Sequence, residues 1–147
     1  MTSRPTPVEN FEPELDVLIP SDVQYIESIV EQVVRRCAAH SYPRRHLSLN
    51  VPVALTEALS NAILRGNHDD VARSVHVHAD VDSIRLVLEV RDEGSGFDLE
   101  ACTEDPTTPE NLLREDGRGL FLMRRLMDHV ERYTDGGNVV RLILRRA

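Results

Sequence analysis

The chain has 147 residues and a formal net charge of −8, with 41% hydrophobic and 29% charged residues. This length and composition are those of one ordinary globular domain, and they exclude wholesale disorder. An acidic chain repels phosphate backbones, so direct nucleic-acid binding is not expected. No run approaches the ~20 apolar residues of a membrane span, and residues 1–14 lack the apolar core of a signal peptide. We therefore expect a cytoplasmic protein that does not enter the membrane.

Two residue types restrict the chemistry. All 17 basic residues are arginine, which excludes any reaction that needs lysine, including phosphate binding by a Walker-type lysine. The two cysteines, Cys37 and Cys102, lie in dissimilar contexts and form neither a CxxC pair nor a metal-ligand cluster. We expect both thiols to be reduced and unpaired.

Hydrophobic periodicity in the first half of the chain predicts one strand and two amphipathic helices after a loose leader. The predicted elements are the leader over 1–10, a strand over 11–19, a helix over 21–39 that opens with a capping box at 21–24, and a helix over 51–65. SYPRR separates the two helices, and Gly66-Asn67 ends the second one.

The second half of the chain is richer in strands. The predicted elements are strands over 74–81 and 84–91, a long loop over 92–119, a helix over 120–128, and a closing hairpin of strands over 130–134 and 139–144. A loop of this length inside a compact domain is usually functional. Helices grouped against a mostly antiparallel sheet predict a two-layer α/β sandwich, formed by a single domain over 11–147.

The predicted second helix carries Glu57, Asn61 and Arg65, each four residues after the last. Each step of four residues turns the helix by only ~40°, so the three side chains form one stripe. Glu57 and Asn61 interrupt an otherwise apolar helix, where a carboxylate or amide needs a polar partner. The stripe indicates either a solvent-facing side with a Glu–Asn contact, or oxygen ligands that face a cleft and suit Mg²⁺.

Two glycine-containing stretches are further candidates for binding. Residues 92–97, DEGSGF, directly follow a predicted strand, where closely spaced glycines permit approach to a ligand and Asp92 can accept a hydrogen bond from an amine. Residues 116–120, DGRGL, lead into a helix whose free N–H groups can bind phosphate, and Arg114 and Arg118 add charge there. The ordinary alternatives are a hairpin turn for the first stretch and a flexible helix start for the second.

The order of these motifs is more specific than any one of them. An ExxxN helix, a DxGxG loop after a strand, a long loop and a GxG helix start resemble the ATP-binding motifs of the GHKL (Bergerat) fold. TEALSNAILRGN, VRDEGSGFDLE and GRGLFLMRRLMDHVE are similar to the small anti-sigma-factor serine/threonine kinases, over nearly the whole chain. The resemblance implies a sandwich with helices on one face of the sheet and an ATP lid at about 98–118.

The resemblance also implies a role for each motif. Asn61 would hold the Mg²⁺ that bridges the phosphates of ATP, and Glu57 would be the general base for a Ser or Thr hydroxyl of an anti-anti-sigma (STAS) protein. Asp92 would accept a hydrogen bond from the adenine amino group, with Gly94 and Gly96 shaping that wall. Gly117, Arg118 and Gly119 would surround the phosphates, and the further ATP-binding candidates are Arg65, Arg114 and Leu120.

The implied assembly is a homodimer that holds a sigma factor and releases it by partner switching. Arg65 stands where such kinases often have His, so it could reach phosphate or simply end the helix, and Arg118 stands at a position that is often apolar. Two other functions fit the same residues. The chain could bind ATP only as a conformational ligand, or it could phosphorylate a STAS scaffold without binding a sigma factor.

The strand predicted over 74–81 carries His76 and His78 on one face, a spacing compatible with metal binding. No third ligand is evident in the sequence, so we expect ordinary surface histidines.

Overall fold

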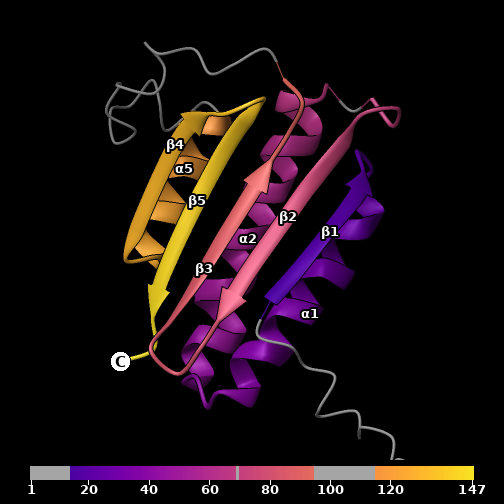
Figure 1. Ribbon diagram of the computed structural model, residues 1–147. Helices are drawn as coiled ribbons and strands as arrows, with labels where there is room; N and C mark the ends of the chain where they lie inside the picture. Colours follow the sequence, from indigo (N-terminus) through magenta and orange to yellow (C-terminus); the bar gives the residue numbers. More distant parts are fainter. Residues whose placement is uncertain (1–13, 69, 95–114) are drawn as a thin grey trace, which may run out of the picture.

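Figure 1 shows a computed structural model of the chain, which describes residues 14–68, 70–94 and 115–147. Five strands form one antiparallel sheet in the order β1-β2-β3-β5-β4. The strands are β1 (Glu14–Pro20), β2 (Ser74–Val81), β3 (Arg85–Arg91), β4 (His129–Thr134) and β5 (Asn138–Arg145). One face of the sheet is covered by α1 (Ile26–Ala39), α2 (Val51–Ser60) and α5 (Glu115–Leu126). The predicted two-layer α/β sandwich is therefore confirmed.

The helix at the centre of the covering layer is longer than predicted. A π-helical stretch, η3 (His46–Asn50), precedes α2, and a second one, η4 (Asn61–Gly66), continues it. The apolar residues that predicted this helix are all buried against the sheet and the neighbouring helices: Val51, Leu55, Ala58, Leu59, Ala62 and Ile63.

By length and composition, the helical segment His46–Gly66 could cross a membrane, because it has 21 residues and its most apolar 18-residue window has a mean hydropathy of 1.3. The expectation that no stretch approaches a membrane span was therefore too broad. In the fold, 44% of the most apolar window of this segment is buried, because its apolar side supplies much of the domain core.

The first helix does not begin with the predicted capping box. The cap is Asp22, whose carboxylate accepts hydrogen bonds from the Gln24 main-chain N–H at 3.0 Å and from its side chain at 2.8 Å. A 3-10 turn, η2 (Val23–Tyr25), then leads into α1. Ser21 is fully buried, and its hydroxyl donates to the carbonyl of Arg73 at 2.8 Å. The capping box was wrong because Ser21 forms a tertiary contact instead of a local one.

The last helix also begins earlier than predicted. α5 starts at Glu115 and not at Leu120, so Gly117 and Gly119 lie inside its first turns. The low helix propensity of glycine is outweighed here by the packing of α5 on α2. The predicted lid therefore ends in helix over 115–118, and its residues 98–114 lie outside the described part of the chain.

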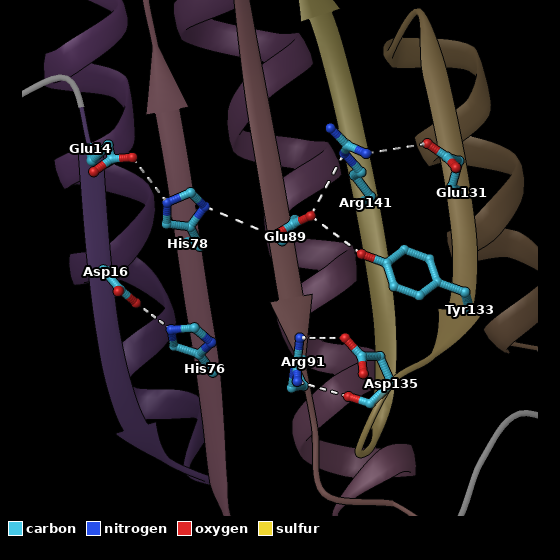
Figure 2. A network of polar contacts seen from close by, with 10 residues as sticks. All are labelled: Glu14, Asp16, His76, His78, Glu89, Arg91, Glu131, Tyr133, Asp135 and Arg141. Carbon is cyan, nitrogen blue, oxygen red and sulfur yellow. Dashed lines mark hydrogen bonds and ion pairs between the residues drawn. The ribbon is translucent and has the colours of Figure 1, made fainter.

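The uncovered face of the sheet carries a network of ion pairs, shown in Figure 2. His76 pairs with Asp16, and the His78 ring nitrogens lie 3.6 Å from Glu14 and 3.9 Å from Glu89. Within the described residues, no group of three His, Cys, Asp or Glu side chains is arranged to hold a metal ion. The two histidines lie on the uncovered face of the sheet and pair with carboxylates, a pairing that the sequence analysis did not predict.

Cys37 is a free cysteine in the core, where burial raises the pKa of its thiol to about 12. It is therefore protonated and unreactive at neutral pH. Cys102 lies outside the described residues.

Candidate functional site

Asp92 lies directly after β3, at the end of the sheet where the neighbouring strand β5 begins. Its main-chain N–H donates to the carbonyl of Asn138 at 3.0 Å, which extends the β3–β5 ladder by one residue. Its Oδ1 accepts hydrogen bonds from the N–H groups of Gly94 at 2.7 Å and Asn138 at 3.2 Å. These contacts fix the carboxylate, which is only 5% exposed.

Glycines from two other segments of the chain approach Asp92 closely. A methyl group placed on Gly66, the last residue of η4, would lie 1.8 Å from Asp92 Oδ2. One placed on Gly137 would lie 2.0 Å from the main-chain oxygen of Asp92. Gly94 is similarly confined, since its added methyl would lie 2.7 Å from the Asn138 amide nitrogen. A larger residue at Gly66 or Gly137 would therefore have to move Asp92, and one at Gly94 would press on Asn138 and on the carbonyl of Gly66.

The electrostatic state of Asp92 reflects this burial. Desolvation raises the pKa of its carboxyl above the usual value, and the hydrogen bonds from Gly94 and Asn138 oppose that shift. Asn138 is itself 7% exposed, and its Oδ1 is buried without a hydrogen-bond partner among the described residues. An acceptor without a donor next to a buried carboxylate suits a ligand that carries an N–H₂ group.

The second half of the site lies on α2 and η4. Glu57 and Asn61 are half-buried, and both face Gly119 of α5. A methyl group on Gly119 would lie 3.1 Å from Glu57 Oε2 and 3.2 Å from the Asn61 amide nitrogen. The predicted Glu–Asn contact is not among the hydrogen bonds of the described residues. Within the described part of the chain, the side chains of Glu57 and Asn61 lie next to α5 without a hydrogen-bond partner.

The residues present fit ATP and Mg²⁺. One asparagine oxygen beside an unpaired carboxylate suits a hard cation that takes its remaining ligands from phosphate and water. At the other end, the carboxylate of Asp92 and the Asn138 oxygen, which has no partner among the described residues, suit a purine amine. η4 begins at Asn61 and ends at Gly66, so about one helical turn separates the two ends.

For the other predicted ATP-binding residues within the described part of the chain, the structure gives a position in the fold. Arg65 is exposed on η4, and Arg118 is exposed on α5. Leu120 is 4% exposed and belongs to the hydrophobic core, so its contribution to a binding site is structural. Gly117 lies in the first turn of α5. The remaining two, Gly96 and Arg114, lie outside the described residues.

Two residues at this site were missed by the sequence analysis as parts of it. Asn138 was predicted only as part of a turn, yet it contacts Asp92 through both its main chain and its side chain. Asn67 was predicted only to end the second helix, yet it is fully buried. A polar residue at a turn or helix end predicts a local cap, and nothing in its sequence neighbourhood indicates burial by distant elements.

The fold and the site together define an ATP-binding α/β sandwich of the GHKL class. A family profile described as the histidine kinase-like ATPase domain matches residues 19–144. The serine-protein kinase RsbW of Bacillus velezensis is 30% identical over 131 residues, which cover 86% of this chain and 81% of that protein. The chain therefore belongs to the histidine kinase-like ATPase family and, within it, to the anti-sigma-factor kinases.

Further relatives agree with this placement. The serine-protein kinase RsbW of Bacillus subtilis is 28% identical over 86% of this chain and 81% of its own length. The anti-sigma F factor of Halalkalibacterium halodurans is 29% identical over 71% of this chain and 73% of its own length. Among solved structures, the RsbU and RsbW domains of Rv1364c from Mycobacterium tuberculosis match with a TM-score of 0.65 at 17% identity. That match covers 91% of this chain and 32% of the larger one, and it supports the fold alone.

Proposed function

We propose that this chain is a cytoplasmic, ATP- and Mg²⁺-dependent serine/threonine protein kinase that also acts as an anti-sigma factor. In this proposal, it sequesters a sigma factor and phosphorylates a STAS-type anti-anti-sigma protein in a partner-switching pathway. The observation that carries the proposal is the placement of Glu57 and Asn61, side by side against Gly119, without a protein partner in the described part of the chain. A carboxylate and an amide held open in this way support phosphoryl transfer, which needs a base and a metal ligand that are free to meet the substrate.

Each residue of the phosphate end has a separate task in this proposal. Asn61 would hold Mg²⁺, which neutralises phosphate charge when it is bound. Glu57, one helical turn before it, would accept the proton from the attacking Ser or Thr hydroxyl. The N–H groups in the first turn of α5 have no partner within the helix, so they can donate to phosphate oxygens.

Asp92 is proposed to select adenine. Its carboxylate would accept from the exocyclic amine, and the unpartnered Oδ1 of Asn138 offers a second acceptor beside it. Guanine presents a carbonyl oxygen at the corresponding position, and two acceptors would then face each other. ATP should therefore bind more tightly than GTP.

The names of the relatives support the partners in the proposal. They include serine-protein kinases and anti-sigma F factors, which suggests both phosphoryl transfer and binding of a sigma factor. A homodimer is part of the same proposal. Mixing the purified chain with sigma factors from its own genome would separate an anti-sigma kinase from a kinase that acts only on a STAS scaffold, because only the former would retain a sigma factor.

The direct test of the kinase is Glu57→Gln. Transfer of labelled phosphate from ATP to a STAS protein of the same genome should fall by about 10²–10⁴-fold, while ATP affinity is unchanged. Glu27→Gln, on the exposed side of α1, is the matched control and should transfer phosphate normally. If Glu57→Gln transferred phosphate at the parent rate, Glu57 would not be the base.

The metal is tested separately with Asn61→Ala. Calorimetric titration of ATP and ADP, with and without Mg²⁺, should show tighter binding with the metal for the parent and none of that increase for the variant. Equal Mg²⁺-dependence in both proteins would contradict the assignment of Asn61. Binding of ATP without any transfer to a protein substrate would instead favour a regulatory ATP-binding module.

A further inference from the structure

Asn67 connects four elements of the fold at the adenine end of the site. It directly follows Gly66 at the end of η4 and is completely buried. Its side-chain amide donates to the Ser21 hydroxyl at 2.8 Å and to the carbonyl of Ser74 at 2.9 Å. Its Oδ1 accepts from the main-chain N–H of Glu93 at 2.7 Å. Both the amide nitrogen and the oxygen of the Asn67 side chain therefore bind groups from other segments of the chain.

The bond to Glu93 is the one that bears on the candidate site. Glu93 lies between Asp92, the proposed adenine acceptor, and Gly94, whose N–H donates to Asp92. Asp92 is held from one side by Asn138 of β5, while Asn67 holds the next main-chain amide from the helical layer. The turn at 92–94 is therefore fixed between the two layers of the sandwich, at the point where the base would lie.

The other hydrogen bonds of Asn67 reach the segment that follows β1 and the start of β2. Ser21, where β1 leads into α1, donates to the carbonyl of Arg73 in addition to accepting from Asn67. The main-chain N–H of Ser74 donates to the Glu93 carboxylate, so the start of β2 meets both Asn67 and the turn. Asn67 thus relates the position of the turn to β1 and β2, which carry no candidate site residues.

We propose that Asn67 is a positioning residue for base recognition, which holds the 92–94 turn so that the Asp92 carboxylate meets the adenine amine. The inference rests on the proposed role of Asp92 in binding ATP. Without the Asn67 acceptor, the Glu93 N–H turns to water, and the turn gains freedom on the side away from β5. The carboxylate then samples orientations that do not match the base, so the loss appears in base affinity and selectivity.

Two variants separate positioning from a general loss of stability. Ser21→Ala removes one partner of Asn67 but leaves its bond to Glu93, so it perturbs the same buried network without releasing the turn. Asn50→Ala removes another buried asparagine, 8% exposed, whose amide donates to the carbonyl of Leu126 at 2.7 Å. Leu126 ends α5, at the opposite end of that helix from Gly119.

The experiment compares the parent with Asn67→Ala, Ser21→Ala and Asn50→Ala, at a temperature where circular dichroism shows all four folded. The dissociation constants of ATP and GTP are measured for each protein. Asn67→Ala should bind ATP about tenfold more weakly and lose a similar factor of its preference for ATP over GTP. Both control variants should keep the preference of the parent.

A second readout needs no nucleotide. Hydrogen exchange at the Glu93 amide, followed by NMR, should accelerate in Asn67→Ala by at least tenfold more than core amides do, and should not accelerate selectively in the controls. Unchanged selectivity or unchanged Glu93 exchange in Asn67→Ala would overturn the positioning role. A parent protein that binds ATP and GTP equally would instead overturn the role proposed for Asp92, and the two failures are thus distinct.

Discussion

The two ends of the candidate site are built in different ways. At the base end, Asp92 is 5% exposed, receives hydrogen bonds from two main-chain amides and is enclosed by glycines. At the phosphate end, Glu57 and Asn61 are half-buried and have no hydrogen-bond partner among the described residues. One helical segment, η4, connects the two ends.

This difference reflects what each end has to recognise. An adenine ring is rigid and offers few polar atoms, so its acceptor gains most from being fixed before the ligand arrives. Phosphates and a hydrated cation bring many charges and ligands of their own, so the protein needs only to leave suitable groups open. Small steric changes at the base end should therefore cause a large loss of ATP affinity and of stability. At the phosphate end, similar changes should leave the stability of the fold intact.

The largest effect is expected from Gly66→Ala. The added methyl would lie 1.8 Å from Asp92 Oδ2, so the carboxylate or η4 has to move. We expect ATP affinity to fall by at least about 100-fold and the unfolding free energy to fall by about 1–3 kcal/mol. Titration calorimetry and urea unfolding would measure the two losses. Wild-type affinity in this variant would show that Asp92 does not have to occupy its present position.

Asp92→Asn should give a smaller loss of affinity with a different effect on stability. Binding of ATP should weaken by about 10–100-fold, because the amine loses a charged acceptor. The pKa of Asp92 is raised by burial, so the folded protein holds this proton more tightly than the unfolded chain does. The contribution of Asp92 to stability therefore decreases as the pH rises from about 3.8 through the raised pKa.

The amide of Asp92→Asn does not titrate, so this variant should lack that decrease and be at least as stable as the parent at pH 7. Urea unfolding between pH 4 and pH 7 would measure the difference between the two proteins. Asp80→Asn, at an exposed position of β2, is the matched control and should follow the parent. A variant less stable than the parent at pH 7 would contradict the conclusion that the ionised carboxylate costs stability here.

Gly119→Ala tests the phosphate end by the same kind of change. The added methyl meets the ends of two side chains, Glu57 and Asn61, which can give way. Alanine favours helix over glycine by about 1 kcal/mol, so the melting temperature should rise slightly. Affinity for ATP with Mg²⁺ should nevertheless fall by about tenfold, because both side chains are displaced from the ligand. If stability and affinity both fell as far as in Gly66→Ala, the two ends would not differ as described.

The sequence predicted the layers of the fold and most of the strands because both rest on local patterns. Alternating apolar residues predicted Ser74–Val81 as β2, and the apolar face of residues 51–65 predicted the central helix. The start of α5 was misplaced because Gly117 and Gly119 predict a break, whereas packing on α2 keeps them helical. Local propensity could not include that tertiary contact.

The same distinction applies to the candidate site. The spacing of Glu57 and Asn61 placed them on one stripe, and the structure brings that stripe to Gly119. Asn138 and Asn67 were missed because their partners lie 46 and 26 residues away in the chain. Ser21 was assigned to a helix cap for the same reason, since its partner Arg73 is 52 residues distant. Buried polar contacts of this range are not encoded in local sequence patterns.

Gly136→Ala should have the smallest effect on binding, and it separates backbone strain from contact with the site. Gly136 has φ +70° in the turn between β4 and β5, a conformation that costs an alanine about 1–2 kcal/mol. Its added methyl would meet only a guanidinium nitrogen of Arg91, at an ordinary 3.8 Å. The unfolding free energy should therefore fall by about that amount, while the dissociation constant for ATP stays within about twofold of the parent. Because this loss of stability overlaps the one expected for Gly66→Ala, an equal loss of affinity in both variants would mean that ATP binding follows overall stability and not the glycine contacts of Asp92.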